Sequence, residues 1–559
     1  MQSTLLPKGV CDHIERIVRQ FVWGSSNTDH KIPLVNWEAI RQPMANGGLG
    51  FRSMFDYNVA FVHKIGFNFI SKPAALWVSL LRQKYRVVDI CPPSIQCVVA
   101  TPLWRAIAAH WDAIRSGVAW SLGNGQSTRF LDDAWIPEIG HLRPFSLRAT
   151  ADFDHLTVNE LVDENGTWNF PLLSSIFPPD IIAHIKGIKC PDLLDCTDTC
   201  VWRWSTSQKF SISSAYKHLQ EPAWDTESPV WKLFWQCPVP QRVRIFCWLV
   251  FRQKLLTNTV RCQRRLTDDS SCPLCAHPQE TNCHTLRDCP AATEVWKRVI
   301  PAALRDTFFT MTAATWLCNN LSSRLIDTQT MVQWPVLFAS TLWQIWKNRN
   351  DVVFNNADVP ASVTLRRSIA WAKCYGNSQA THSATLHPSR AVVWHPPIQG
   401  GVCLNVDGSS SSSSKHCSIG GLLRDTNGSW LWGFYKHVGT ASVLQTELWA
   451  IYIGLLQAWE HGYEMLEVQS DCKQTVALVS DTTAGNSPLS LVRAIRNLCC
   501  RAWLVEFVWI PRDANRPSDG LSKMADCSTD DLILLEDPPP SIARLIEQDS
   551  FMFSSANCF

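Results

Sequence analysis

The sequence predicts a multidomain protein whose carboxyl-terminal part is an α/β domain. A length of 559 residues is too great for one hydrophobic core and suggests three or four domains. Apolar and polar side chains alternate over 402–406 and again over 466–470, which is typical of half-buried strands. Between these runs, apolar side chains recur at spacings of three and four over 448–459, which indicates an amphipathic helix before Gly462. Strand and helix signals thus alternate along this segment.

Composition narrows the class of protein. With 46% hydrophobic and 18% charged residues, the chain is globular rather than disordered. The net charge of +2 is nearly neutral, so any contact with nucleic acid must come from local patches. No run of 18 apolar residues exists and residues 1–11 lack an apolar core, so we expect no membrane span and no signal peptide. The 22 cysteines are dispersed, which favours reduced thiols in the cytoplasm or the nucleus, without separating the two.

Four acidic residues stand at the ends of the predicted carboxyl-terminal elements. Asp407 closes the first alternating run, so it belongs at the centre or the end of a strand, and Asp471 follows the second run, at the carboxyl end of a strand. Glu447 opens the predicted helix, and Asp519 lies in a short helix after a strand predicted at 505–510. Acids so far apart in the sequence can meet only through the fold.

These acids predict a particular chemistry. Crowded carboxylates repel one another, and hard cations such as Mg²⁺ relieve the repulsion. Two such ions about 4 Å apart can activate a water, hold a phosphate and stabilise the leaving oxygen. The sequence therefore predicts a metal-dependent phosphodiesterase. For each acid alone, a helix cap or a solvated charge is the commoner role, so the hypothesis depends on the four together.

Within 396–527, five short motifs follow one another: Asn405-Val406-Asp407-Gly408, Gly420-Gly421-Leu422-Leu423-Arg424-Asp425, Thr446-Glu447-Leu448, Gln469-Ser470-Asp471, and Arg512-Asp513-Ala514-Asn515 with Asp519. They resemble the type 1 ribonuclease H domain of plant non-LTR (LINE-like) retrotransposons and their derived proteins. The resemblance implies a five-stranded mixed sheet with flanking helices and cleavage of RNA in RNA–DNA hybrids. It also implies two Mg²⁺ ions, with Mn²⁺ as an alternative, on the four matching acids, Asp407, Glu447, Asp471 and Asp519.

Two departures from this family stand out. Many members have a histidine in the loop before the last acid, but Val508 to Asp513 contains none, and slower turnover is one expected effect. Six serines at 409–414 follow the first strand, and we interpret them as a lengthened hairpin loop.

A second constellation, at 272–289, has the spacing of a metal site. Cys272 and Cys275 form a knuckle, and His284 and Cys289 follow, which predicts a closed tetrahedral site for a structural Zn²⁺. Cys283 and His277 are alternative ligands, and ordinary buried thiols without metal are a further alternative. The arrangement resembles the zinc-binding region of plant reverse transcriptases, including Glu280 before the histidine.

Upstream of the knuckle, residues 237–265 hold seven basic side chains and no acidic one, with Phe246, Trp248 and Phe251 interleaved. This pattern favours a surface that binds phosphates and stacks bases. An amphipathic helix with buried rings and solvated arginines explains it equally well. The candidate nucleic-acid contacts are Arg242, Arg244, Arg261, Arg264 and Arg265.

The amino-terminal part carries one misleading motif. Three short motifs resemble the segment that follows the polymerase domain in LINE-type reverse transcriptases. They are Phe21-Val22-Trp23-Gly24, Gly47-Gly48-Leu49-Gly50-Phe51 and Leu76-Trp77. Phe130-Leu131-Asp132-Asp133 looks like the aromatic-x-Asp-Asp turn of a polymerase palm. It follows Gly123-Asn124-Gly125, however, and no second acidic motif precedes it, so we expect no polymerase activity.

The predicted order is a post-polymerase connector at 1–140, a Pro-rich connector at 141–195, a mainly helical zinc-binding domain at 196–300, a helical linker region at 301–395, a ribonuclease H domain at 396–527 and a tail at 528–559. The resemblance implies a retroelement-derived protein that binds RNA–DNA hybrids and hydrolyses their RNA strand. The alternative hypothesis is a catalytically idle, nucleic-acid-binding remnant of a truncated LINE-like element. Protein partners are not indicated.

Overall fold

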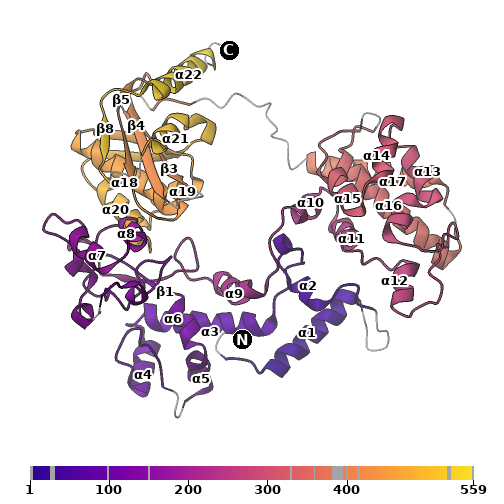
Figure 1. Ribbon diagram of the computed structural model, residues 1–559, viewed down its shortest axis with the longest axis horizontal. Coiled ribbons are helices and arrows are strands. Elements are labelled where there is room, and N and C mark those ends of the chain that lie inside the picture. Colours follow the sequence, from indigo (N-terminus) through magenta and orange to yellow (C-terminus); the bar gives the residue numbers. More distant parts are fainter. Residues whose placement is uncertain are drawn as a thin grey trace. The chain divides into compact units, whose positions relative to one another are not determined.

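The chain divides into two compact units that do not follow the predicted boundaries. The computed structural model describes residues 4–24, 32–96, 100–148, 151–327, 330–357, 359–380, 394–397, 401–411, 416–525 and 530–556. Unit 1 contains Met1–Leu5, Asn58–Leu219 and Ser389–Phe559, and unit 2 contains Leu6–Tyr57 and Gln220–Pro388. Figure 1 labels their elements.

Unit 2 is helical and includes both the zinc-binding segment and most of the predicted linker. Its helices are α1 (Lys8–Trp23), α2 (Trp37–Arg41), α10 (Val230–Gln236), α11 (Gln241–Phe251), α12 (Asn258–Gln263), α13 (Pro290–Lys297), α14 (Arg305–Thr310), α15 (Ala313–Ser322), α16 (Trp334–Asn355) and α17 (Ala361–Ala380). Rings from α11, α13, α15 and α16, including Phe246, Trp296, Trp316 and Phe338, share one core. Residues 301–355 are therefore packed with the zinc-binding segment. The rest of the predicted linker, 381–393, lies outside the described residues.

The first part of unit 1 is a small mixed structure. It comprises most of α3 (Met54–Ser71), then α4 (Leu76–Tyr85), α5 (Pro102–Ala109), α6 (Trp111–Ser116), β1 (Val118–Ser121), α7 (Phe170–Ile176), α8 (Pro179–Lys186), β2 (Thr199–Trp202) and α9 (Ile212–Gln220). β1 and β2 pair antiparallel. Buried Asp198 organises the neighbouring glycine turn, because its carboxylate accepts from the N–H groups of Gly123 and Gly125 at 2.8 and 2.9 Å and from Thr128.

The carboxyl-terminal part of unit 1 is built on a mixed sheet. Its elements are β3 (Val402–Ser410), β4 (Cys417–Arg424), β5 (Trp430–His437), α18 (Val443–Glu460), β6 (Met465–Ser470), α19 (Lys473–Ser480), α20 (Ser490–Cys499), β7 (Leu504–Trp509), α21 (Arg516–Ser522), β8 (Ile533–Leu535) and α22 (Pro540–Ala556). The strand order is β7-β6-β3-β4-β5-β8. The first five are the mixed sheet that the sequence implied, and β8 adds a sixth strand from the predicted tail, antiparallel to β5.

Helices cover both faces of this sheet. Leu404 and Val406 on β3 pack against α18, where Gly454 lies directly over them. Asn405 and Asp407 alternate with these residues and face the other side, on which α21 lies. The predicted serine loop is wrong for its first two residues, because Ser409 and Ser410 belong to β3 and pair with β4. Residues 412–415 of that loop lie outside the described residues.

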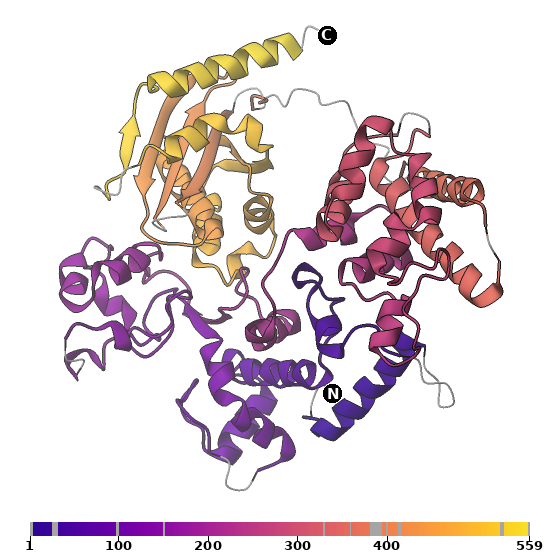
Figure 2. The same ribbon diagram turned by 45° about the vertical axis from the view of Figure 1, so that its right-hand side comes forward.

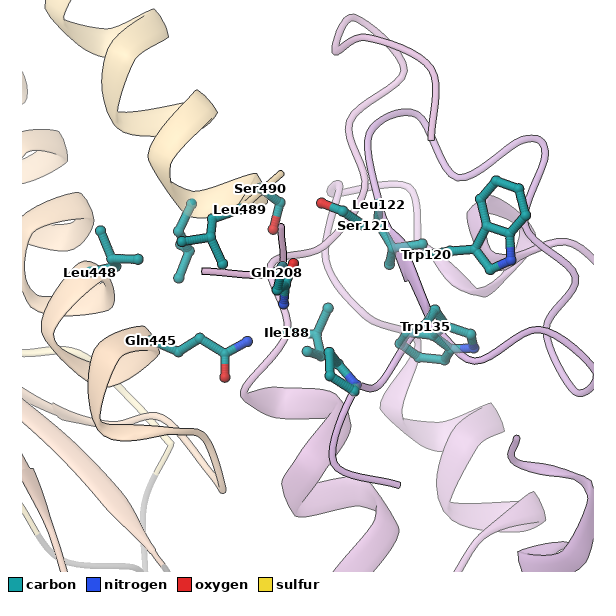
Figure 3. Close-up of a pocket in the computed structure, with 12 residues that line it drawn as sticks. Trp120, Ser121, Leu122, Trp135, Ile188, Gln208, Gln445, Leu448, Leu489 and Ser490 are labelled. Carbon is teal, nitrogen blue, oxygen red and sulfur yellow. The ribbon is translucent and has the colours of Figure 1, made fainter. Parts of the chain in front are cut away.

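The connector packs directly on the helices of this domain. Buried Arg493 on α20 donates to Ser121 Oγ at 3.1 Å and to the Leu122 carbonyl at 2.6 Å. The indole of Trp449 on α18 donates to the Gly187 carbonyl at 2.9 Å. Figure 3 shows one pocket at the seam between the two parts, of about 20 Å³, which is space for about one water. A second pocket, of about 570 Å³, is also lined by residues of both parts, among them Trp204 and Gln445.

Helix α22 completes the core on the α21 side. Ile542 and Ile546 pack on Leu422 and Leu521, and Figure 2 shows α22, in yellow, alongside the sheet. The fully buried guanidinium of Arg424 on β4 pairs with the Asp549 carboxylate at 2.9 Å. The predicted tail therefore contributes both a strand and a helix to the domain. Among the described residues, no helix has the length and apolar character that crossing a bilayer requires.

We expect Asp549→Ala to destabilise the domain by about 3–5 kcal/mol, because removing one partner leaves the other charge buried and unpaired. Thermal unfolding of the full chain, with hydrogen exchange of the β4 amides, measures this. Glu547→Ala is the control, since Glu547 is exposed on the same helix. Equal stability of the two variants would contradict the prediction.

Candidate functional site

Strand register brings two of the predicted acids to one edge of the sheet. β3 and β6 are parallel, with Asn405 paired to Gln469, so Asp407 and Asp471 lie two positions further along neighbouring strands. Because parallel strands point the same way, their carboxyl ends place both carboxylates side by side. Asp407 lies within β3, three residues before its last residue, and Asp471 directly follows β6.

Two glycines allow helices to approach β3 and β4 at this edge. A Cβ on Gly408 would meet the Glu447 backbone nitrogen at 2.9 Å, and one on Gly420 would meet the Ser522 nitrogen at 2.3 Å. The first close approach brings Glu447 of α18 next to the strand acids. Ligand oxygens of Asp407, Glu447 and Asp471 all lie within 4.8 Å of one another.

Asp519, the fourth predicted acid, stands at the rim of this cluster. Its carboxylate pairs with Lys523 at 2.5 Å and with Arg512 at 3.4 Å, and it is not one of the three acids that meet within 4.8 Å. On the same helix, the Ser522 hydroxyl donates to Asp407 Oδ2 at 2.8 Å. Helix α21 therefore contacts the cluster through Ser522 and holds Asp519 beside it.

Burial and mutual repulsion make the cluster electrostatically unfavourable without a cation. Burial, then Asp407 and Asp471, raise the pKa of Glu447 to about 9. Burial, with Asp471 and Asp519 adding to it, raises the pKa of Asp407 to about 6 despite the bond from Ser522. Burial also raises the pKa of Asp471. A divalent cation would allow all three to ionise, and three close carboxylates are the hard oxygen ligands that Mg²⁺ prefers.

A buried polar network fixes the strands behind the acids. Asn405 Nδ2 donates to Gln469 Oε1 at 2.8 Å, which joins β3 to β6. Asn515 Nδ2 donates to the Val406 carbonyl at 2.9 Å, and Arg424 Nε donates to Asn405 Oδ1 at 3.1 Å. Both the backbone pairing and these side-chain hydrogen bonds therefore fix the register of β3 and β6, which sets the positions of the acids.

The second candidate site gathers the four predicted zinc ligands. Ligand atoms of Cys272, Cys275, His284 and Cys289 all lie within 4.8 Å of one another. The Sγ atoms of Cys272 and Cys289 are 3.9 Å apart, and Cys275 Sγ is 3.3 Å from His284 Nε2. The ligands come from the knuckle and from the two ends of a π-helical turn, η6 (His284–Asp288), after which Cys289 precedes α13. Such turns are frequent at functional sites.

Two thiols of this cluster share one proton. The hydrogen bond between Cys272 and Cys289 lowers the pKa of Cys272 to about 4 and raises the pKa of Cys289, because one sulfur retains the shared proton. The alternative ligand Cys283 lies outside the cluster, and burial raises its pKa to about 11. His277 stacks on His284 with ring centroids 4.5 Å apart. Three cysteine thiols and one histidine imidazole in this arrangement fit Zn²⁺.

A buried ion pair holds the zinc loop against α16. Arg349 donates to both oxygens of Glu280 at 2.7 Å, and both side chains are fully buried. Asn258 Oδ1 accepts from the same guanidinium at 3.2 Å. The glutamate that the sequence placed before His284 therefore has a structural partner 69 residues away.

The basic segment differs from the predicted stacking surface. Phe246 and Trp248 are 3% and 1% exposed, so these rings cannot stack on bases, and the amphipathic interpretation holds for them. Arg244 donates to the Cys237 carbonyl, and Arg264 to the carbonyls of Pro33 and Leu34.

The remaining predicted arginines make fewer contacts with the rest of the protein. Arg242 lies over the Trp371 ring and Arg261 donates to Asn258, whereas no side-chain contact of Arg265 with other described residues is observed. Phosphate contacts by the five arginines stay a prediction.

Both aspartates of the polymerase-like motif form ion pairs with arginines. Asp132 pairs with Arg143 at 2.8 Å, and Asp133 pairs with Arg129 at 3.2 Å. The hydrogen bonds from Arg143 lower the pKa of Asp132. These acids stabilise the connector.

Sequence reasoning missed the cations at the rim of the acid cluster. Arg512 and Lys523 contact Asp519, and Lys473 lies two residues after Asp471. Their positions next to the acids in the sequence were a usable signal. The Arg424–Asp549 pair had none, because its partners are 125 residues apart.

Comparisons with known proteins agree with this geometry. Residues 405–525 match the family described as "Reverse transcriptase-like", and residues 210–296 match "zinc-binding in reverse transcriptase". A "Putative ribonuclease H protein" of Arabidopsis thaliana is 29% identical over 560 residues, 98% of this chain and 90% of the relative. An "Uncharacterized mitochondrial protein" of the same plant is 30% identical over 152 residues, 26% of this chain and 96% of the relative. The chain belongs to the plant retrotransposon-derived proteins.

Solved structures of ribonucleases H are also similar to this retrotransposon-derived protein. RNase H1 of Halobacterium salinarum is 21% identical, with 22% of this chain and 96% of that chain covered and a TM-score of 0.20. The N-terminal RNase H domain of a Mycobacterium tuberculosis protein is 21% identical, with 22% and 91% covered and a TM-score of 0.21. The expected ribonuclease H fold of the carboxyl-terminal domain is confirmed, with β8 and α22 added to it.

In magnesium-free buffer, we expect the stability of the protein to fall as pH rises from about 5 to about 9. The ordinary pKa of Glu447 is 4.5 and its folded pKa is about 9, so between these values the folded state holds a proton that the unfolded chain has lost. The slope from this one group is about 1.4 kcal/mol per pH unit at most. Thermal unfolding at several pH values measures it.

Glu447→Gln removes this titrating group, so its pH slope should be flatter than that of the wild type. Added Mg²⁺ should also flatten the wild-type slope, because a bound cation favours the ionised carboxylates. Identical slopes for variant and wild type in magnesium-free buffer would refute the assignment.

Proposed function

We propose that the ribonuclease H domain is a metal-dependent endonuclease that hydrolyses the RNA strand of RNA–DNA hybrids. The observation that carries this proposal is the meeting of Asp407, Glu447 and Asp471 within 4.8 Å at the carboxyl edge of the sheet. The ribonuclease H name of the Arabidopsis relative supports the substrate class.

In this proposal Asp407, Glu447 and Asp471 hold two Mg²⁺ ions, with Mn²⁺ as an alternative, and Asp519 assists from the rim. When bound, the ions supply Lewis-acid activation of water and stabilisation of the leaving oxygen. The Ser522 hydroxyl orients the Asp407 carboxylate through its 2.8 Å hydrogen bond. Trp509 fixes the backbone of Asp471, since its indole donates to that carbonyl at 2.9 Å.

Replacing the clustered acids tests this function. We expect Asp407→Asn or Asp471→Asn to lower the rate of hybrid cleavage by on the order of a thousand-fold, because a metal ligand is lost while the core is kept. Asp519→Asn should cost less, on the order of ten-fold, since its carboxylate stands outside the cluster. Asp513→Asn is the matched control, exposed in the same loop. The measurement is cleavage of a labelled RNA–DNA hybrid with and without Mg²⁺.

The same assay separates the two hypotheses for the chain. A wild-type protein that binds the hybrid and never cleaves it would be the catalytically idle remnant. Cleavage that survives both Asp407→Asn and Asp471→Asn would place the chemistry elsewhere.

We also propose that Cys272, Cys275, His284 and Cys289 bind a structural Zn²⁺. All four protein ligands are supplied from close range, so no open position is left for chemistry. The shared proton of Cys272 and Cys289 supports this, because a cation would replace it. The fold of the segment between α12 and α13, which has little regular structure, would then depend on the metal.

Cys272→Ser should lower zinc content and expose residues 258–300 to proteolysis. Cys283→Ser is the matched control, because this neighbouring thiol lies outside the cluster. Metal analysis of the purified full chain and limited proteolysis give the two readouts. Equal zinc content in the two variants would contradict the ligand set.

A further inference from the structure

Two exposed cations contact the acid at the rim of the cluster, and a third lies close to a clustered acid in the sequence. Arg512, which is 78% exposed, and Lys523 both contact the Asp519 carboxylate. Lys473 is also exposed, but within the described part of the chain its ammonium has no ion-pair partner. It follows Asp471 by two residues, so a cation with free donors stands beside one of the proposed metal ligands.

The ammonium of Lys473 is held in place by an aromatic ring. Its Nζ lies 4.0 Å from the ring centroid of Trp509, at the end of β7. The same indole donates to the Asp471 carbonyl at 2.9 Å, so the ring is itself anchored to the loop that carries the acid. A lysine positioned in this way loses less conformational entropy when it binds a ligand.

Stability does not explain a lysine at this position. Lys473 is the first residue of α19, and the positive end of a helix dipole disfavours a cation there. The first turn of α19 contains no acidic residue to offset this charge. The pair with the ring contributes only about 0.5–1 kcal/mol at an exposed site. An anion bound near Lys473 would be favoured both by the ammonium and by the helix end.

A nucleic-acid substrate requires such a contact. The acid cluster repels phosphate groups, and the phosphates next to the scissile linkage must nevertheless lie close to it. A fixed cation at the rim reduces this repulsion without neutralising the acids.

We propose that Lys473, held over Trp509, binds a backbone phosphate of the nucleic acid next to the scissile linkage. The inference rests on the proposed function for the position of that linkage. Lys473 contacts substrate, whereas Trp509 is a positioning residue that joins this contact to the backbone of Asp471.

The test compares Lys473→Ala with Lys84→Ala in the full chain. Lys84 is a matched control, because it is exposed and also lies over an aromatic ring, that of Tyr85, at 5.4 Å. Binding of an RNA–DNA hybrid is measured with Ca²⁺ in place of Mg²⁺, at several salt concentrations, and cleavage is measured separately with Mg²⁺.

Lys473→Ala should weaken hybrid binding about five-fold and reduce the slope of log K against log salt by about one, as expected for one lost phosphate contact. Lys84→Ala should change neither. Trp509→Phe keeps a ring under the lysine and removes the bond to Asp471, so it should lower kcat more than it weakens binding.

The outcomes separate this inference from the proposed function. Equal binding by the Lys473 and Lys84 variants, in a protein that cleaves the hybrid, would overturn the inference and leave the function standing. Absence of cleavage by the wild type would overturn the function, and the binding comparison would still decide the role of Lys473.

Discussion

Repulsion among three carboxylates, two of them buried and one half-buried, is the constraint on which the carboxyl-terminal domain depends. Asp407, Glu447 and Asp471 are brought within 4.8 Å although burial and mutual charge raise their pKa values. The surrounding structure must supply the energy that holds them together. Parallel pairing of β3 with β6, the absence of a Cβ at Gly408 and the amide network of Asn405 all act at this edge. The carboxylates therefore repel one another at the same edge of the sheet where strand pairing, close helix packing and side-chain hydrogen bonds fix the geometry.

The elements that hold this arrangement extend beyond the span of the family motifs. Arg493 and Trp449 bond to the connector, and Asp549 neutralises Arg424 from the last helix. These contacts come from segments that carry no catalytic motif. A domain defined as residues 396–527 omits β8 and α22, and with them the partner of a fully buried cation. The residues that carry the family motifs are therefore fewer than the residues that form the packed domain.

The sequence predicted those features that local patterns record. Acids at the ends of alternating runs located Asp407 and Asp471, and a short Cys-x-x-Cys knuckle located the Cys/His cluster, because both depend on spacing within a few residues. The rest depends on distant pairing. Nothing in the sequence near 549 identifies a partner for β4, and interleaved rings and arginines do not reveal that Phe246 and Trp248 face a core. Asp519 was predicted as a fourth metal ligand, but it pairs with Lys523 and Arg512 and stands outside the three clustered acids.

The Arg424–Asp549 pair has a consequence for biosynthesis. A ribosome produces β4 well before α22, so the guanidinium of Arg424 waits through 125 residues of further translation for its counter-ion. Until then, its site in the sheet cannot be closed without an unpaired charge, which keeps the nascent domain open. Messages truncated before this helix would yield chains that retain every catalytic motif and still fail to mature.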